Sequence, residues 1–540
     1  MPTVPAWTET AVVYEIYPQT FFDANGDGIG DLPGVIAKLD HVTSLGVDAI
    51  WLNPFYGSPM RDAGYDVADF YAVHPRYGNL LDAKKLFESA HKIGLRVLLD
   101  FVPGHTAADH PWFQASIDNR APYKDWFVWT TSAWDNGGPA WAPKMVHGTT
   151  SRNGNYVCNF FAHQPALNYG FGKPEQPWQL GIDHPHVQAL WAEMKNVQRF
   201  WLDLGADGFR IDMAGSIIRL DPDQSAIDRF WRECRTEVWE ANGRDDVFTV
   251  AEWSWPKHAL KGDGLHADFL HWIPSYAAVF RGQKGKPAYF ARSGQGDASA
   301  FLKDYLDHYR HTRGKGHICI PVGNHDLSRL NDPTRAIDGA STVAELELVH
   351  AFLLTMPGVP FLFAGDEIGQ RQLPDITPTR EGNYGGRSGA RTPMPWAPGK
   401  NLGFSTAPSE HLWAGIDPAP DAPTVAAAEA DQQSLLHRIR ALIAKRRTEP
   451  ALRASAAFTL VYAEPNAYPL IYARGEGAAA AIILLNPADR VVSGDCALPA
   501  EFATRKLGSR FIGGNVDLTI EGGRLHWRAN GVSFAGVRLA

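Results

Sequence analysis

The stretch Gly208-Phe209-Arg210-Ile211-Asp212 decides the fold, because it is a short apolar run that ends in a carboxylic acid. Residues 248–252 and 318–326 repeat this form. Runs rich in branched and aromatic residues are typical of buried strands in a parallel sheet. Open α/β sheets and barrels place their chemistry at the carboxyl ends of such strands. Three acids at three strand ends therefore predict a carboxylate-based active site.

Strand-like runs alternate with helix-like runs on both sides of that stretch. Eight strand candidates follow one another along the chain, which is the number in a (β/α)8 barrel. We therefore predict an α/β protein with a TIM barrel. The candidates are residues 12–17, 49–53, 96–102, 208–212, 248–253, 267–272, 317–322 and 360–364.

The alternation stops in two places, and each predicts a further domain. Residues 105–174 are rich in Trp, Asn, Gly and Pro without a regular period, which indicates a loop-rich domain B inserted after the third strand. From residue 454 the chain changes to short β-type runs separated by turn residues, which indicates a C-terminal antiparallel β-sandwich, residues 454–540. The barrel is expected to comprise residues 1–104 and 175–453.

Composition narrows the kind of ligand and the location. The 540 residues carry a net charge of −8 in mixed order, whereas nucleic-acid binding needs a basic face, so we expect a small neutral substrate and no nucleic acid. The longest apolar stretch, residues 351–364, is shorter than the ~20 residues of a membrane helix, and no secretory signal is visible. We expect no membrane association and a cytoplasmic protein with reduced thiols, because the four cysteines lie far apart: Cys158, Cys234, Cys319 and Cys496.

Asp212 and Glu252 end neighbouring predicted strands, so their carboxyls are expected to face each other across a cleft. Paired carboxylates about 5 Å apart serve retaining glycoside hydrolysis, one as nucleophile and one as acid/base. Arg210 lies on the same strand face as Asp212 and is expected to lower its pKa. Trp253 and Trp255 flank Glu252 and are expected to raise its pKa. A buried ion pair would explain one such acid, but three in this order favour an active site.

These segments resemble the α-amylase family, glycoside hydrolase family thirteen, and most closely its α-glucosidase and oligo-1,6-glucosidase branch. The resemblance implies that Asp212 is the nucleophile, with Arg210 as its partner, and that Glu252 is the acid/base. Residues 324–326 resemble the segment in which an Asp, here Asp326, holds the 2- and 3-hydroxyls of the sugar and a His, here His325, assists. In residues 100–105, His105 is implied to contact the 6-hydroxyl.

Further segments resemble the pocket that holds a terminal glucose in this branch. Asp62 and Tyr65 are implied to line that pocket, and Arg391 is implied to pair with Asp62. Such a pair would close the pocket behind one glucose and impose exo action, which disfavours an amylase that acts inside polymers. Gln164 opens the fifth segment of the branch, and Phe160 is implied to form a pocket wall.

The loop that follows the first predicted strand, residues 23–31, alternates oxygen-bearing residues with glycines like an EF-hand. Glycine at the sixth position fits that motif, whereas no glutamate stands at the twelfth. We predict a structural Ca²⁺ or Mg²⁺ site of the kind this branch carries, with an acidic turn as the metal-free alternative and no organic cofactor. The expected ligands are Asp23, Asn25, Asp27, the Ile29 carbonyl and Asp31.

Four features depart from the family pattern, and each concerns substrate choice or domain packing. Gly104 replaces the usual Asn before the His, so a second calcium site between barrel and insertion is not expected. Ala166 replaces an Asp of the fifth segment, and Met213 replaces a small or β-branched residue after the nucleophile. The short spacing between Asp212 and Glu252 implies a reduced loop beside the acceptor site.

We therefore expect a retaining exo-acting α-glucosidase that hydrolyses terminal α-linked glucose from short oligosaccharides or α-glucosides through a covalent glucosyl-enzyme. The alternative is an α-glucosyl transferase or a sucrose/trehalulose-type isomerase, in which a sugar hydroxyl takes the place of water. A non-catalytic transporter-accessory relative is disfavoured, because all three acids are present. Linkage preference stays open, as does the choice between monomer and homodimer.

Overall fold

The computed structural model describes residues 4–148, 150–283, 285–333, 341–374 and 387–540. Its centre is a parallel sheet of eight strands in the order β11-β10-β9-β8-β5-β2-β1-β12. This is the predicted α/β barrel, and each strand falls where the sequence analysis places it. The strands are β1 (Val13–Ile16), β2 (Ala49–Leu52), β5 (Arg96–Phe101), β8 (Gly208–Ile211), β9 (Phe248–Ala251), β10 (Ala267–Phe269), β11 (His317–Cys319) and β12 (Phe361–Phe363).

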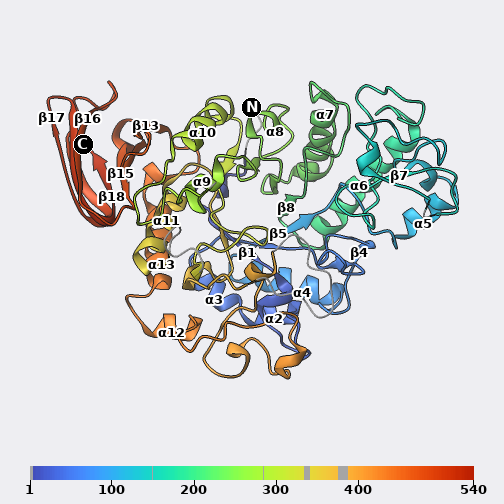
Figure 1. The fold of residues 1–540 in the computed structure, drawn as a ribbon, viewed down its shortest axis with the longest axis horizontal. Helices are drawn as coiled ribbons and strands as arrows, with labels where there is room; N and C mark the ends of the chain where they lie inside the picture. The colour runs from blue at the N-terminus through green and yellow to red at the C-terminus, as the bar shows by residue number, and fades with distance from the viewer. Residues whose placement is uncertain (1–3, 149, 284, 334–340, 375–386) are drawn as a thin grey trace.

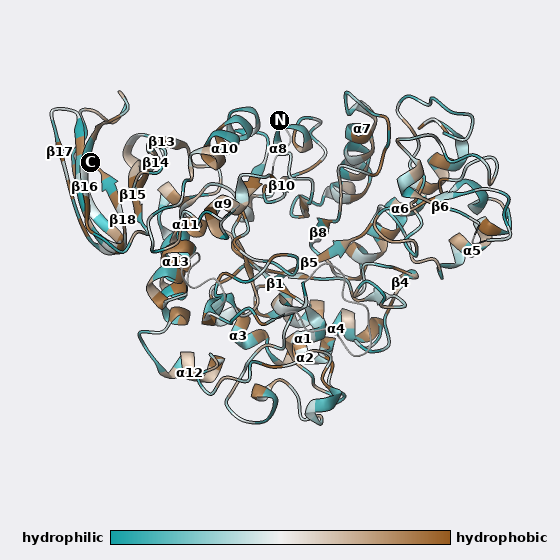
Figure 2. Cartoon of the chain, in the orientation of Figure 1, coloured by the Kyte–Doolittle hydropathy of each residue, from teal (hydrophilic) through white to brown (hydrophobic). Residues whose placement is uncertain are grey.

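Helices alternate with these strands along the chain, and two of them begin with reciprocal capping boxes, at Asn79 with Asp82 and at Thr342 with Glu345. Teal and brown residues mix on most of the helices in Figure 2, as expected for helices that bury one face. None of the described helices combines the length and apolar character needed to cross a membrane. The main helices are α2 (Leu32–Ala37), α3 (Leu39–Ser44), α4 (Leu80–Lys92), α6 (Pro185–Leu204), α7 (Ser225–Cys234), α10 (Ser299–Thr312), α11 (Val343–Thr355) and α13 (Leu435–Thr448).

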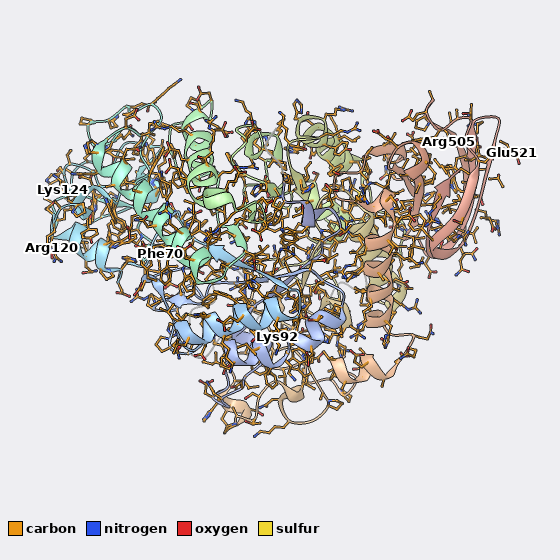
Figure 3. The ribbon with its side chains drawn as sticks, turned by 180° about the vertical axis from the view of Figure 1, so that it is seen from behind. Phe70, Lys92, Arg120, Lys124, Arg505 and Glu521 are labelled. Atoms are coloured by element: carbon orange, nitrogen blue, oxygen red, sulfur yellow. The ribbon has the colours of Figure 1, made fainter. Side chains whose placement is uncertain are left out.

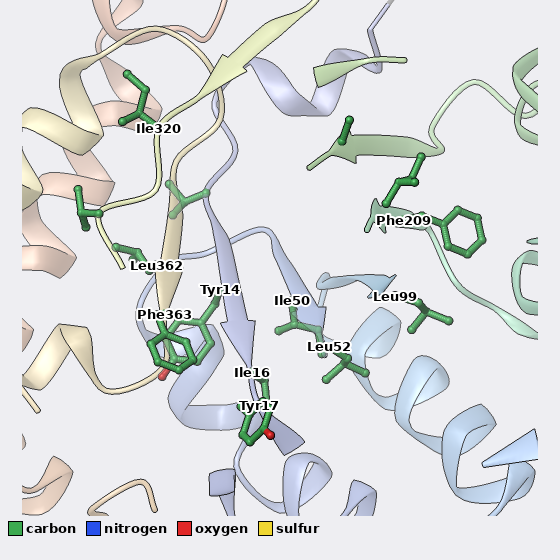
Figure 4. Packing of buried hydrophobic residues seen from close by; sticks show 14 of the residues in the cluster. Tyr14, Ile16, Tyr17, Ile50, Leu52, Leu99, Phe209, Ile320, Leu362 and Phe363 are labelled. Carbon is green, nitrogen blue, oxygen red and sulfur yellow. The ribbon is translucent and has the colours of Figure 1, made fainter. Parts of the chain in front are cut away.

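Alternate residues of the barrel strands face opposite sides. The Trp51 ring of β2 contacts Phe269 of β10 and Phe361 of β12, strands that are not neighbours of β2, so these side chains fill the barrel interior. Tyr14 and Ile50 belong instead to the large cluster between strands and helices, part of which Figure 4 draws. The interior is therefore a packed core below the site.

The interior positions change from apolar to charged toward the carboxyl ends of the strands. Two residues beyond interior Val13, Leu98 and Val250 stand Glu15, Asp100 and Glu252, all buried. The period of two along each strand thus carries the charged groups to one end of the barrel. Barrels of this kind place their active sites at that end.

The chain between β5 and α6 forms the loop-rich lobe that the sequence predicts, far from the C-terminal sheet in Figure 1. It contains α5 (Pro111–Ile117) and a two-stranded sheet of β6 (Met145–Val146) and β7 (Tyr156–Val157). The backbone of Ala166 pairs with that of His105 in an isolated bridge, and the Ala166 side chain is fully buried.

The C-terminal strands join one antiparallel sheet of six strands among the described residues, where the sequence analysis predicts a sandwich. The reason is the length of β18, which pairs with β15 and β16 along one edge and with β17 along the other. In Figure 3, Arg505 and Glu521 mark the C-terminal region at one end of the molecule, and Arg120 and Lys124 of the insertion mark the opposite end. The strands are β13 (Phe458–Tyr462), β14 (Leu470–Arg474), β15 (Ala481–Asn486), β16 (Val492–Ala497), β17 (Leu507–Glu521) and β18 (Arg524–Leu539).

Candidate active site

A cavity of about 550 Å³ opens at the carboxyl ends of the barrel strands. The structure brings seven predicted site residues together in its lining: Asp62, Tyr65, His105, Phe160, Asp212, Glu252 and Asp326. Seven lining residues were not predicted as site residues: Phe161, Met213, Gly215, Ser216, Trp253, Trp272 and Arg387. The other predicted site residues contact the lining from behind: Gln164, Arg210, His325 and Arg391.

Arg210 on β8 connects the acids at the base of the cavity. Its Nη1 lies 2.7 Å from Asp100 Oδ1 and 3.1 Å from Asp212 Oδ1, and its Nη2 lies 2.6 Å from Glu252 Oε2. The guanidinium is buried, so it neutralises part of the negative charge that the strand ends bring together. Asp100 stands in a segment that the sequence analysis matched, but no role was predicted for it.

The pKa directions of the two central acids differ from those expected from sequence. Burial raises the pKa of Asp212 well above its ordinary value; Arg210 opposes the rise, and the charge of Glu252 adds to it. Burial alone would also raise the pKa of Glu252, but Arg210 and then His271 lower it well below the usual range. The cause is geometric, because Arg210 lies closer to Glu252 than to Asp212 and His271 Nε2 lies 3.6 Å from Glu252 Oε1.

The Asp212 and Glu252 carboxyls also hydrogen-bond to each other. Two carboxyls in contact do not both ionise near neutral pH, so the pair holds one proton between them. In this arrangement the surrounding donors favour the charge on Glu252 and the proton on Asp212.

His325 joins two further acids behind the cavity. Its Nδ1 lies 2.6 Å from Glu15 Oε1, and its Nε2 lies 2.6 Å from the Tyr65 hydroxyl and 3.2 Å from Asp326 Oδ2. Burial opposes a charge on the ring, but Asp326 and Glu15 raise the pKa of His325 to about 9. The imidazolium in turn helps to hold the pKa of Asp326 well below its ordinary value despite burial. Asp326 therefore presents a charged carboxylate to the cavity, and Glu15 is a residue that sequence reasoning missed.

The ion pair predicted between Asp62 and Arg391 is wrong in this structure. Arg391 Nη2 lies 2.9 Å from Asp326 Oδ1, and its Nε donates to the His325 carbonyl at 2.7 Å. Arg387 instead connects the two acids, with Nη1 at Asp326 Oδ1 and Nη2 3.4 Å from Asp62 Oδ1. A short 3₁₀ turn, Ser388–Ala390, separates the two arginines and turns Arg391 behind Asp326. Gln164 contributes by donating to Asp62 Oδ2 at 2.7 Å.

Arg387→Gln is expected to raise KM by roughly tenfold, because one hydrogen bond to a charged group contributes about 1.5–3 kcal/mol. Steady-state kinetics on a disaccharide measures the effect, with Arg371→Gln as control because Arg371 pairs with Asp417. Burial raises the pKa of Asp62 to about 6, against the opposing charge of Arg387. Below that pH Asp62 becomes neutral and loses its ion pair, so the wild-type KM should also rise as pH falls. Unchanged KM in Arg387→Gln would show that this bridge does not close the pocket.

The departures from the family pattern have structural explanations. A side chain at Gly104 would place its Cβ 2.8 Å from Asn159 Nδ2. That amide donates to the Gly104 carbonyl at 2.9 Å and lies 3.2 Å from His105 Nδ1, while Arg219 Nη2 donates to Asn159 Oδ1 at 3.1 Å. Asn159 thus fills the space that glycine leaves. Met213 has a φ of 47° and lines the cavity directly after Asp212.

The predicted metal loop is compact and partly satisfied by its own backbone. Asp23 accepts from the backbone N–H groups of Gly26 at 2.7 Å and Gly28 at 2.8 Å, and Asp31 caps α2 at Gly34. Burial raises the pKa of Asp31, and backbone N–H donors oppose this rise. The negative charge of Asp23 adds to the rise, so the two acids lie close enough to repel each other. Among the described residues, no cluster of three or more His, Cys, Asp or Glu is placed to hold a metal. A cation here would therefore also need the amide and carbonyl oxygens of the predicted set.

Comparison with known proteins agrees with this geometry. Residues 15–455 match the family model described as "Alpha amylase, catalytic domain". The chain is 32% identical over 535 residues to a probable alpha-glucosidase of Rhizobium meliloti (strain 1021), covering 90% of each protein. It is 32% identical over 514 residues to the trehalose synthase/amylase TreS of Mycobacterium tuberculosis (strain ATCC 25618 / H37Rv), covering 84% of this chain and 78% of that protein.

Solved structures give the same answer. An alpha-glucosyl transfer enzyme, XgtA, superposes with a TM-score of 0.75 at 28% sequence identity, covering 100% of both chains. The family match spans most of the chain and contains all three acids of the cavity. This chain therefore belongs to the alpha-amylase family of glycoside hydrolases.

Proposed function

We propose that this protein is a retaining, exo-acting α-glucosidase that releases α-linked glucose from the ends of short oligosaccharides or α-glucosides. The observation that carries the proposal is the contact between the Asp212 and Glu252 carboxyls in a cavity bounded by the Arg387 bridge from Asp326 to Asp62. Close carboxyls serve retention, since a wider gap is needed to admit water for inversion. The bridge limits the sugar side to a terminal residue. Relatives named alpha-glucosidase and oligo-1,6-glucosidase support this substrate class.

The proposed reaction has two steps, and each inverts the configuration at the anomeric carbon of the sugar. Asp212 attacks the anomeric carbon, while the glycosidic oxygen leaves with a proton from Glu252. Water then loses a proton to Glu252 and displaces Asp212, which restores the α configuration. The charged Asp326 accepts hydrogen bonds from sugar hydroxyls as the ring flattens. A sugar inserted between Asp212 and Glu252 would break their mutual hydrogen bond, and the first step needs the proton of the pair on Glu252.

Product analysis tests the proposal directly. The enzyme is incubated with maltose, isomaltose, kojibiose, nigerose, trehalose and sucrose, and the first-formed anomer is recorded by NMR. We expect glucose released as the α anomer from at least one of them. Initial release of β-glucose would contradict retention, and cleavage of a maltooligosaccharide series whose first products contain no glucose would contradict exo action.

A glucosyl transferase or isomerase is the second candidate, and the acceptor side of the cavity favours it. Trp272, Trp253 and Met213 present apolar surface near Glu252, and the Trp272 side chain is half exposed. Such a surface binds the apolar face of a sugar ring and displaces water. Relatives named trehalose synthase and alpha-glucosyl transfer enzyme support this candidate. In the same incubations, rearranged or elongated products in excess over free glucose would favour it.

We also propose a structural Ca²⁺ or Mg²⁺ in the loop of residues 23–31. Asp23, Asn25, Asp27, the Ile29 carbonyl and Asp31 would hold the ion. Asp23 also accepts a hydrogen bond from the Ser405 hydroxyl, so the loop connects the region after β1 to the segment after Arg391. The ion would offset the repulsion between the two buried acids and take no part in the chemistry.

Chelation is expected to lower Tm by a few degrees with little effect on the kcat of the enzyme that stays folded. An ion present at about 100 times its Kd adds roughly 2.7 kcal/mol to the free energy of unfolding. Differential scanning calorimetry with and without EDTA measures the shift, and Asp27→Asn should reduce it. A Tm that does not respond to chelation would leave the acidic turn without a metal.

We infer a cytoplasmic location from the cysteines. All four are free thiols, and Cys234 and Cys319 are buried. Burial raises the pKa of both to about 12, which makes them unreactive. Thiols kept reduced in this way are usual in a reducing compartment.

A further inference from the structure

The end of β10 surrounds the Glu252 carboxyl with groups that no sequence motif singled out. The Trp272 indole N–H donates to Glu252 Oε1 at 2.9 Å, and Arg210 Nη2 holds the other oxygen, Oε2, at 2.6 Å. His271 Nε2 lies 3.6 Å from Oε1, too far for a good hydrogen bond. Trp272 is thus a direct neutral donor to Glu252.

Asp268 on the same strand fixes the turn that follows Glu252. Its buried carboxylate accepts from the backbone N–H groups of Trp253 and Trp255 at 2.9 Å each and of Ser254 at 3.3 Å. Ser254 has a φ of 58°, a conformation that costs energy for a residue with a Cβ. Three N–H groups directed at one acid hold this strained turn. Glu252 is therefore fixed from the backbone side by Asp268 and at its carboxyl by Arg210 and Trp272.

The Trp272 side chain also lines the cavity, in addition to donating its N–H to Glu252. Trp272 keeps 50% of its surface exposed and lines the cavity together with Trp253 and Met213. Trp255 is similarly exposed, at 43%, but it is not part of the lining and its ring contacts that of His258. Trp272 therefore connects the acid/base to the cavity, whereas Trp255 does not.

We propose that Trp272 is a positioning residue for Glu252, whose indole N–H holds one carboxylate oxygen while its ring face receives the acceptor. This inference rests on the proposed function, because it assigns Glu252 the proton transfers of a retaining enzyme. An N–H donor stabilises the charged form of a carboxylate. By stabilising the carboxylate, the Trp272 N–H lowers the pKa of Glu252. It therefore favours the ionised form that accepts a proton from water in the second step. It also lowers the pH above which Glu252 loses the proton needed in the first step.

Other charged groups also act on Glu252 and must be held constant in a test. Asp212 and Arg210 face it from β8, and His271 from the end of β10. Asp326 faces it from the loop after β11 and opposes its ionisation. Trp272→Phe changes none of these side chains. It removes the N–H donor and keeps an aromatic ring.

The test compares the pH profiles of kcat/KM for the wild type, Trp272→Phe and Trp255→Phe, with folding checked by Tm. Loss of the donor should move the alkaline limb of Trp272→Phe upward by roughly one pH unit, as one hydrogen bond to a charged group predicts. The Trp255→Phe profile should match the wild type. An unmoved alkaline limb in a folded, active Trp272→Phe enzyme would overturn the proposal while leaving the α-glucosidase function intact. A wild type that releases no glucose would instead overturn the proposed function.

A second pair of variants separates the ring from its N–H. Trp272→Ala removes both, so its ratio of transfer to hydrolysis with added glucose should fall by several fold relative to Trp272→Phe. Equal ratios in the two variants would show that the ring face does not receive the acceptor. The comparison is internal to two variants that share the lost donor, so a general loss of activity does not affect it.

Discussion

Replacing Asp212 by asparagine is expected to lower kcat by at least about 10³-fold, because the variant cannot form the covalent glucosyl-enzyme. An amide is a poor nucleophile, whereas its size and its place beside Arg210 are those of the acid. Binding should change little, so the loss is expected in kcat rather than in KM. Steady-state assays on the preferred disaccharide measure both parameters.

Asp203→Asn is the matched control for this variant. Asp203 lies on α6 with its side chain 60% exposed and pairs with Arg244 far from the cavity lining. The same chemical change should there leave kcat within the error of the assay. Near-normal turnover in Asp212→Asn would end the assignment of the nucleophile and with it the retaining mechanism.

Glu252→Gln is expected to lower turnover on a disaccharide by at least about 10³-fold, since the sugar leaving group needs a proton. On p-nitrophenyl α-glucoside the first step needs no proton, so the variant should release a burst of nitrophenol and then stall as the glucosyl-enzyme. Stopped-flow absorbance measures the burst, and mass spectrometry of the intact protein detects the added glucosyl group on Asp212.

The pH profile provides an independent check on Glu252. The alkaline limb of kcat/KM on disaccharides, which reports loss of the proton that the Asp212–Glu252 pair holds, should disappear in Glu252→Gln. Glu240→Gln is a suitable control, because Glu240 pairs with Arg235 and does not line the cavity. Equal losses on the disaccharide and on the activated substrate would mean that Glu252 does not act as the acid.

The barrel and its three acids could be predicted from the sequence because both depend on local patterns. A strand buried on both faces must be apolar along its length, so an acid at its end is conspicuous. Glu15 does not follow a complete apolar run, because it lies inside the first strand between Tyr14 and Ile16. Only its pairing with His325 reveals its role. Contacts between distant strands leave no mark in the sequence of either one.

The pocket arginine and the pKa directions could not be predicted for a different reason. Arg387 and Arg391 stand four residues apart, and the path of the short turn between them decides which one reaches Asp62. The sequence placed Arg210 beside Asp212 correctly, but a difference of half an ångström in distance gives Glu252 the larger share of its charge. Geometry at that scale depends on the packing of the whole barrel end.

The contact between Gly104 and Asn159 has a consequence for protein engineering. Gly104 belongs to the barrel segment after β5, whereas Asn159 belongs to the inserted lobe, and the amide of one occupies the volume where the other would carry a side chain. A chimaera that takes its lobe from a relative with a different residue at either position would create an overlap or a hole next to His105. Residues 104 and 159 must therefore be exchanged together in such a graft.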